Sequence, residues 1–382
     1  ALNLGEAMTP ITLNYTVNAN ASSGSSGSSS AGSSSSTSFV YANNKLSNGE
    51  RHTCAILDNG DVKCWGWDQY GQVGDGGPTW TGPVPTNTDA PSSTAIDLGT
   101  GRTAVAVSSG TQHTCVILDS GDMKCWGRDY RGQLGDGGPV WTGSNPTDLN
   151  APSTTAIDLG TGRTAVAIGA GSVHTCAILD NTDLKCWGHD DKGQLGNGGT
   201  IMNSNTPPTT AIDLGTGRTA VAVDGGGFFT CALLDNGDVK CWGSDQYGQL
   251  GDGGPVWVQW SPTDVNAPST TAIDLGTGRT AVAIATGLFH TCAILDNGDL
   301  KCWGSDDKGQ LGDGGSNTNT NAPPTAAINL GTGRTAVAVA AGERHTCAIL
   351  DNGDLKCWGY NSHGQLGYGN TVDLDAPSST AI

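Results

Sequence analysis

The chain has 382 residues, of which 59 are glycine and only 14% are charged, and its formal net charge at pH 7 is -18. Only three of the 36 acidic residues are glutamate, and the aspartates that make up the rest favour turns and caps over helix interiors. The composition therefore excludes a mainly helical protein. The acidic balance argues against binding to nucleic acid or to an anionic membrane, because both require clustered Lys and Arg. The sequence contains no apolar run long enough to insert into a membrane.

The first 20 residues form a segment of their own. Residues 11–17 alternate apolar with polar side chains, which predicts a half-buried β-strand. Its apolar positions are Ile11, Leu13, Tyr15 and Val17. Three arrangements of this strand are open: pairing with an edge of its own domain, addition to a sheet of a neighbouring subunit, or a free tail. Donation to a neighbour would repeat head to tail and build a filament. Asn14 and Asn20 match the pattern of glycosylation acceptors.

A low-complexity stretch follows the strand. Residues 21–38 contain only Ser, Gly, Ala and Thr, which predicts a flexible tether or a carrier of glycans. The chain is therefore divided into a strand segment over residues 1–20, a tether over 21–38 and a repeat domain over 39–382.

Six copies of one unit fill the repeat domain. The first cysteine of each copy recurs in steps of 61, 61, 55, 61 and 55 residues, and a second cysteine, followed at once by Trp-Gly, lies ten positions after it. In the first copy, two short β-forming runs flank Asp58-Asn59-Gly60, which predicts a hairpin that places Cys54 opposite Cys64. Opposed cysteines of an antiparallel pair lie close enough to form a disulfide. The predicted pairs are Cys54–Cys64, Cys115–Cys125, Cys176–Cys186, Cys231–Cys241, Cys292–Cys302 and Cys347–Cys357.

Zinc binding is the alternative use of these cysteines. Structural zinc sites favour closely spaced pairs in a four-ligand set, which a nine-residue gap repeated six times does not match. The histidine two positions before the first cysteine is also replaced by Phe229 in the fourth copy. We therefore expect disulfides and no metal or other cofactor. Six disulfides indicate an oxidising compartment, so an extracellular or cell-surface location is expected.

A second recurrent segment reads Ala-Ile-Asp-Leu-Gly-Thr-Gly-Arg-Thr-Ala-Val-Ala-Val over residues 95–107. It recurs four times, from Ala156, Ala211, Ala272 and Ala327. Alternation of Val with small residues predicts a strand with one face toward a core. The Gly-Thr-Gly-Arg stretch is interpreted as a turn, because no Lys-Ser/Thr follows it as in a phosphate-binding loop.

The copies also share Gly-Gln-Leu-Gly after the second cysteine. With His-Thr-Cys-Ala-Ile-Leu-Asp-Asn-Gly-Asp-x-Lys-Cys-Trp-Gly before it, this series resembles the repeat of the regulator of chromosome condensation family over roughly residues 44–382. The resemblance implies an all-β propeller of four-stranded blades around a central channel. Family members usually have seven blades and six units are counted here, so a seventh stays open. Ala1-Leu-Asn-Leu-Gly5 and Ala381-Ile382 share the phase of residues 95–99, which would let the two ends meet in one blade.

The fold alone does not define the function. The founding member of the family acts on a nuclear GTPase through a projecting hairpin that has no counterpart here, and secreted relatives include inhibitors that bind β-lactamases across one face of the propeller. In this chain the loops after Gly-Gln-Leu-Gly differ most between copies, and three of them carry tryptophan. These indoles either gather into a patch that binds a protein or a glycan, or each shields its own blade. The candidate binding residues are Trp67, Trp80, Trp141, Trp257 and Trp260.

Catalytic motifs are missing from the sequence. It contains no nucleophile elbow, no H-E-x-x-H, no dinucleotide fingerprint and no unpaired cysteine. We therefore expect a non-enzymatic extracellular or cell-surface structural protein, with self-assembly through the N-terminal strand as the specific mechanism. The alternative is a secreted binding module that uses the tryptophan-bearing loops. The expected partner is accordingly the chain itself, or another protein or glycan.

Overall fold

The computed structural model describes residues 45–77, 87–88, 90–138, 148–199, 203–254, 264–315 and 318–382. The chain divides into two units, Ala1–Phe39 and Val40–Ile382, and every described residue belongs to the second. Several predicted features lie outside the described residues: Ile11, Leu13, Tyr15, Val17, Asn14, Asn20, Trp80, Trp141, Trp257 and Trp260.

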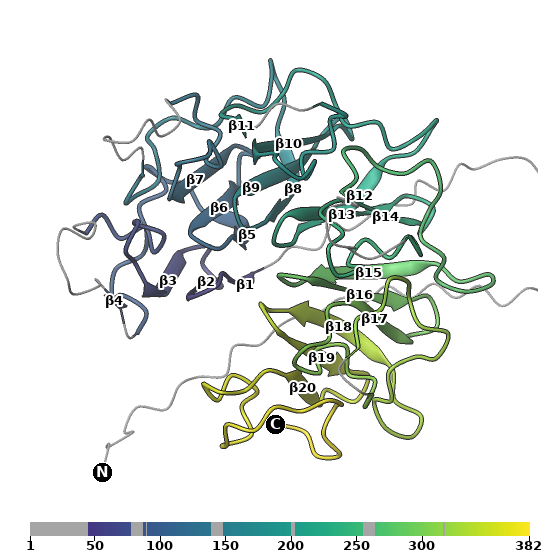
Figure 1. The fold of residues 1–382 in the computed structure, drawn as a ribbon. Coiled ribbons are helices and arrows are strands. Elements are labelled where there is room, and N and C mark those ends of the chain that lie inside the picture. Colours follow the sequence, from purple (N-terminus) through teal and green to yellow (C-terminus); the bar gives the residue numbers. More distant parts are fainter. Residues whose placement is uncertain are drawn as a thin grey trace, which may run out of the picture. The chain divides into compact units, whose positions relative to one another are not determined.

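The described residues form six antiparallel sheets that follow one another in chain order (Figure 1). The first three sheets comprise β1 (Leu46–Asn48), β2 (His52–Ile56), β3 (Val62–Trp67) and β4 (Asn87–Thr88); β5 (Ala104–Ser109), β6 (His113–Leu118) and β7 (Met123–Gly127); and β8 (Ala165–Ala170), β9 (His174–Leu179), β10 (Leu184–His189) and β11 (Asn203–Ser204). The last three comprise β12 (Ala220–Gly225), β13 (Phe229–Leu234) and β14 (Val239–Gly243); β15 (Ala281–Thr286), β16 (His290–Leu295) and β17 (Leu300–Gly304); and β18 (Ala336–Ala341), β19 (His345–Leu350) and β20 (Leu355–Gly359). Across these ranges there is no helix, and so none with the length and apolar character of a membrane span.

The central hairpin of each sheet has the predicted register. In the first sheet Cys54 lies opposite Cys64, the Leu57 amide donates to the Asp61 carbonyl at 2.8 Å, and Gly60 has a φ of 84°. A glycine is favoured there because side chains clash in the left-handed region. All six predicted cysteine pairs are disulfide-bonded, with Cα atoms 4.0–4.1 Å apart.

The outer strand of each sheet is shorter than the predicted four-stranded blade requires. It is a two-residue strand in the first and third sheets and an isolated bridge in the other four. In the second sheet the Asp148 carboxylate accepts the Asp129 amide at 3.0 Å, so a side chain takes the place of a ladder carbonyl. Pro152, which lacks an amide hydrogen, follows three residues after the bridge at Leu149. These two features end the outer strand after a single pair.

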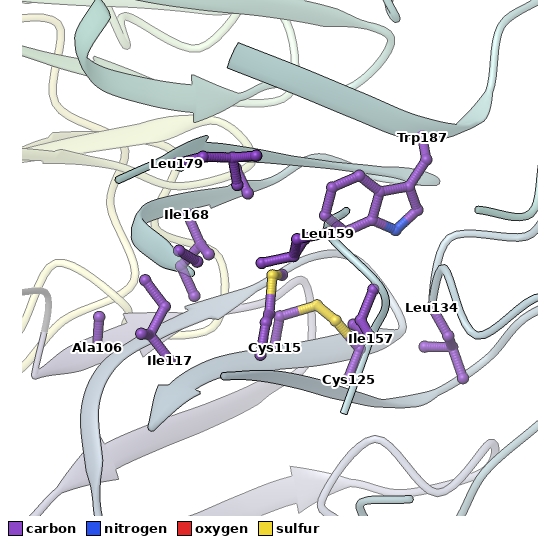
Figure 2. Close-up of a cluster of buried hydrophobic side chains, with 13 residues drawn as sticks. Ala106, Cys115, Ile117, Cys125, Leu134, Ile157, Leu159, Ile168, Leu179 and Trp187 are labelled. Carbon is purple, nitrogen blue, oxygen red and sulfur yellow. A yellow bond between two sulfur atoms is a disulfide. The ribbon is translucent and has the colours of Figure 1, made fainter. Parts of the chain in front are cut away.

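The core lies between adjacent sheets. Figure 2 shows one such junction, in which the disulfide, Leu134 and Ile157 of the second sheet pack against Trp187, Leu159 and Ile168 at the third. Trp187 is fully buried. The disulfides of the first five sheets are therefore part of a junction as well as a link within their own hairpins.

Buried hydrogen bonds also connect the neighbouring repeats at each junction. The indole of Trp126 and the hydroxyl of Thr114 both donate to the main-chain carbonyl of Gln72 in the preceding repeat, at 3.0 and 2.9 Å. His52 of the preceding repeat bonds the same hydroxyl at 2.9 Å. The bond from Thr to the Gln carbonyl recurs at every junction, whereas the Trp187 indole has no hydrogen-bond partner in the described residues and Phe229 replaces the histidine in the fourth repeat.

The last sheet has a face that no described strand covers. The Ile382 amide donates to the Leu355 carbonyl at 3.0 Å, as the Ile96 amide does to Val62 in the first sheet. Leu355 and Ile382 are 37% and 49% exposed, whereas Leu300, the counterpart of Leu355 in the fifth sheet, is fully buried. Neighbouring sheets contact each other in chain order, and no described strand of the last sheet makes a comparable contact with the first.

Candidate partner-binding surface

Each hairpin has one end that recurs and one end that varies between repeats. The tip of the hairpin and its Asp-x-Gly-Asp turn are nearly the same in all six copies, whereas the residues around the opposite end differ. Four positions vary there: the residue before the second strand, the residue after Trp-Gly, and the two residues before Gly-Gln. We call these 24 positions the variable band. They are Arg51, Trp67, Gln69 and Tyr70; Gln112, Arg128, Tyr130 and Arg131; Val173, His189, Asp191 and Lys192; Phe228, Ser244, Gln246 and Tyr247; Phe289, Ser305, Asp307 and Lys308; and Arg344, Tyr360, Ser362 and His363.

A constant backbone frame holds these different side chains. The Trp67 amide donates to the Arg51 carbonyl at 2.8 Å, and the same bond joins the corresponding pair in each of the other five repeats. The buried Gln72 side chain accepts the Tyr70 amide at 3.0 Å, and its counterparts do the same. Backbone geometry is therefore set by residues that recur, so the side chains of the band are free to differ without changing the fold.

A buried acid closes five of these six loops. The Asp68 carboxylate accepts the Val73 amide at 2.8 Å, and its counterparts repeat the bond. Burial raises the pKa of Asp129 to about 7 and that of Asp306 to about 6, and these backbone hydrogen bonds oppose the rise. The sixth repeat has Asn361 at this position, and its amide oxygen accepts the Leu366 amide at 2.9 Å. The loop therefore needs an acceptor rather than a charge.

Most of the lysines and arginines that do not occupy recurrent positions lie in the band. Six of the nine lysines occupy the recurrent Lys-Cys position, and five of the nine arginines occupy the Gly-Thr-Gly-Arg turns. In five repeats the recurrent lysine is buried and bonds a backbone carbonyl, and the five turn arginines pair with aspartates. Of the seven remaining cations, only Lys45 lies outside the band.

Aromatic residues show the same distribution. Apart from the recurrent tryptophans and Phe229, the described residues include eight Trp, Tyr or Phe side chains. Seven of these lie in the band, and the exception is Tyr368. In a protein with so few charged and aromatic residues, this is a marked concentration at one end of the hairpins.

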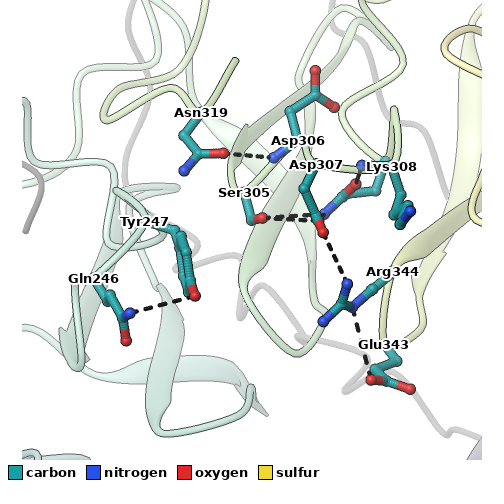
Figure 3. Close-up of polar contacts among 10 residues, drawn as sticks. Gln246, Tyr247, Ser305, Asp306, Asp307, Lys308, Asn319, Glu343 and Arg344 are labelled. Atoms are coloured by element: carbon teal, nitrogen blue, oxygen red, sulfur yellow. Dashed lines mark hydrogen bonds and ion pairs between the residues drawn. The ribbon is translucent and has the colours of Figure 1, made fainter. Parts of the chain in front are cut away.

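Side chains of the band touch across sheet boundaries. The Tyr247 and Phe289 rings lie 4.9 Å apart, and the Arg344 guanidinium reaches the Asp307 carboxylate at 2.8 Å. Figure 3 shows this second contact and places Ser305 and Lys308 beside it, with Tyr247 on the neighbouring repeat. Arg128 of the second repeat lies over the Tyr70 ring of the first at 4.2 Å. The band therefore runs across several repeats as a connected surface.

Of the five tryptophans proposed for binding, the structure places one. Trp67 is half-buried in the band, 5.5 Å from the Tyr70 ring in an edge-to-face arrangement and 5.4 Å from the Arg51 guanidinium. Two short outer strands also lie beside the band: the backbone of Asn87, in the first repeat, pairs with Trp67, and that of Asn203, in the third repeat, pairs with His189. The other band residues were not predicted from the sequence, because the prediction rested on tryptophans that lie outside the recurrent series. A column-by-column comparison of the six repeats contains the signal, because the variable positions alternate with fixed ones.

No metal centre is evident in this surface or elsewhere in the described ranges, where no group of three or more His, Cys, Asp or Glu side chains is placed to hold an ion. Four of the five recurrent histidines, His52, His113, His174 and His290, are buried in the junctions and bond threonine hydroxyls. They belong to the frame.

Comparisons with known proteins agree with this architecture. The RCC1-like domain profile matches residues 36–381, so the chain belongs to the RCC1-like domain family. It is 30% identical over 334 residues to the ultraviolet-B receptor UVR8 of Arabidopsis thaliana, covering 87% of this chain and 68% of UVR8. It is also 30% identical over 303 residues to the E3 ubiquitin-protein ligase HERC2 of Homo sapiens. That match covers 79% of this chain but spans only 6% of the length of HERC2.

Solved structures share the fold at lower identity. Human WBSCR16 superposes with a TM-score of 0.71 at 22% identity, covering 89% of this chain and 82% of that protein. Yeast RCC1 (Prp20), in a structure bound to Kap60, superposes with a TM-score of 0.69 at 19% identity, covering 87% of this chain and 73% of that protein. A further structure of Prp20p from Saccharomyces cerevisiae was described together with its binding to Gsp1p and histones. These structures support the propeller fold with six described blades.

Proposed function

We propose that this chain is a non-enzymatic binding propeller that holds a partner protein against the variable band. One observation carries the proposal: side chains diverge between otherwise matching repeats at the band, where the aromatic residues and cations that the frame does not use also collect. Aromatic residues and arginine are enriched in the cores of protein interfaces and supply most of their strongest contacts. A fixed frame with changing side chains is the arrangement expected of a scaffold that presents a specific surface.

The family supports a binding role for the fold. Yeast RCC1 was solved with Kap60, and its structure was described with Gsp1p and histone binding. UVR8 is named as a receptor. The ligase activity named for HERC2 belongs to a protein of which this chain matches a small part, and it forms no part of the proposal.

Capture from the medium or surface fraction of the producing cells tests the binding role. We expect the full chain to capture at least one protein that is lost when Phe228, Tyr247 and Phe289 are changed together to alanine. The matched control changes Asn236 and Asn297 to alanine at the opposite end of the hairpins, where both side chains bond only exposed turn aspartates. If the band variant and the control capture the same proteins, the band is not the binding surface.

The tryptophan-bearing loops extend this surface in the proposal. Alanine at Trp80, Trp141 and Trp257 is expected to weaken capture further, because indoles bury large areas in binding sites. A purified glycan panel run beside the protein capture separates a glycan ligand from a protein ligand. Unchanged capture by the triple tryptophan variant would restrict the site to the band.

An extracellular or cell-surface location is part of the proposal, supported by the six disulfides of the hairpins. Alkylation of thiols in protein isolated from its source, followed by intact mass measurement, should find all 12 cysteines protected. Free thiols in that preparation would argue for a reducing compartment.

Assembly through the N-terminal strand is the second function proposed, supported by the alternating pattern of residues 11–17 and the tether that follows it. Electron microscopy of the purified chain should show polymers that disappear when residues 1–21 are deleted. The deletion should leave the disulfides and the β-sheet circular dichroism unchanged. Single particles from the full chain would exclude this mechanism and leave the binding role standing.

A further inference from the structure

Two arginines of the band differ from all others in the protein. The chain has nine arginines, and seven of them lie within 4.0 Å of a carboxylate: Arg51, Arg102, Arg163, Arg218, Arg279, Arg334 and Arg344. Arg128 and Arg131 form no ion pair within the described residues. In a chain with twice as many acids as bases, two neighbouring arginines without a carboxylate partner are an exception that requires an explanation.

Aromatic rings hold these arginines in place. The Arg128 guanidinium lies between two tyrosines, 4.2 Å from the Tyr70 ring centre and 4.0 Å from that of Tyr130. Its Nη1 donates to the Gln112 side chain. Arg131 lies 5.1 Å from the centre of the same Tyr130 ring. Stacking occupies the faces of a guanidinium and leaves the N–H groups at its edge for hydrogen bonds.

No described carboxylate forms an ion pair with either arginine. Of the 36 acids in the chain, 34 are described, and only Glu6 and Asp89 lie outside the described residues. The neighbouring loop over residues 139–147 contains no acid. Burial raises the pKa of Asp148, and a hydrogen bond from the Asp129 amide and the charge of Arg128 oppose this rise. The side chains of Asp148 and Arg128 nevertheless form no ion pair. The Nε of Arg131 is buried and has no hydrogen-bond partner in the described part of the structure.

We infer that Arg128 and Arg131, with Tyr70 and Tyr130, form a site that recognises an acidic segment of the partner protein. The inference rests on the proposed binding role of the band and names the chemistry of the partner at its first two repeats. The two guanidiniums present planar donor edges that match carboxylates in two-point hydrogen bonds. The tyrosine rings supply apolar contact beside them. Among the other band cations, Arg51, Lys192 and Arg344 pair with carboxylates of this chain, and Lys308 lies 5.5 Å from the centre of the Tyr360 ring.

A labelled oligoglutamate peptide is the probe for this site. We expect it to bind the full chain in fluorescence anisotropy at physiological ionic strength, where repulsion from the overall negative charge is screened beyond about 8 Å. Changing Arg128 and Arg131 together to glutamine should weaken binding by about tenfold or more, because the loss removes both charged donors from one contact. Arg128→Lys should weaken it as well, because an ammonium group does not reproduce the planar stack.

The matched control is the pair Arg163→Gln and Arg218→Gln. It removes the same charge from the hairpin turns, where the arginines pair with Asp180 and Asp235 at 3.2 and 3.4 Å. Equal weakening in both double variants would reduce the effect to net charge and overturn the inference. Binding of polygalacturonate but not oligoglutamate would overturn it too, in favour of an acidic glycan. If the arginine variant loses the peptide while the Phe228, Tyr247 and Phe289 variant still captures all its proteins, the acidic site stands and the wider binding proposal fails.

Discussion

The two ends of each hairpin differ in how they use the same kinds of residue. At the tip, arginines pair with aspartates in the same way five times, and Asn59 bonds Asp61 in a turn that recurs with little change. At the band, arginines lie over tyrosine rings or pair with acids, depending on the repeat. Exposed pairs of this kind contribute little to stability, so repetition at the tip preserves the same local turn geometry in each repeat. Variation at the band cannot serve a shared structural need.

The largest expected difference is between a tryptophan buried in a junction and a tryptophan of the band. Trp303 is fully buried in a junction, where its indole donates to the Gln249 carbonyl at 3.1 Å, whereas Trp67 is half-buried in the band. We expect Trp303→Ala to destabilise the protein by about 3–5 kcal/mol, because it leaves a cavity and removes one of the two side-chain hydrogen bonds to the Gln249 carbonyl. Trp67→Ala should stay within about 1 kcal/mol, the scale of one aromatic contact. Urea denaturation of both variants measures the difference, and equal losses would show that Trp67 belongs to the core.

The buried histidines give the stability of the repeats a pH dependence. Burial lowers the pKa of His174 to about 3, whereas the unfolded chain takes up this proton near its ordinary value of 6.5. The unfolded state therefore binds more protons between those values, so the stability contributed by His174 is complete above pH 6.5 and is lost as the pH falls toward 3.

His174→Phe tests this linkage with a residue the protein already uses. Phe229 fills the same position in the fourth repeat and packs against Gly226, as His174 packs against Gly171. We expect the free energy of unfolding to fall less between pH 7 and pH 5 in the variant than in the parent chain. The difference should be on the order of 1–2 kcal/mol, measured by thermal unfolding at both pH values. An unchanged difference between the two pH values would mean that His174 is not held neutral in the fold.

Local rules made the hairpins and disulfides predictable from the sequence. The contacts between repeats and the band could not be predicted in this way. The spacing of Cys54 and Cys64 around Asp58-Asn59-Gly60 sets turn, register and disulfide together, because a two-stranded hairpin allows only one pairing for that loop. The buried link from Trp126 to Gln72 joins residues 54 positions apart and depends on the packing of neighbouring sheets, which no local pattern specifies. Arg128 between Tyr70 and Tyr130 depends on the same packing, since its two rings come from different repeats.

The smallest expected effect lies at a tip where the repetition fails. Five hairpin turns have glycine at the left-handed position, whereas the third repeat has Thr182 with a φ of 70°. A β-branched residue is strained in that region, so Thr182→Gly should stabilise the protein by about 1 kcal/mol. Peptide and partner binding should be unaffected, because the tip lies at the opposite end of the hairpin from the band. Gly237→Thr in the fourth repeat is the reverse experiment and should destabilise by more, since a Cβ there would lie 2.5 Å from Thr280. A variant at position 182 that loses stability would show that Thr182 makes a contact worth more than the strain it carries.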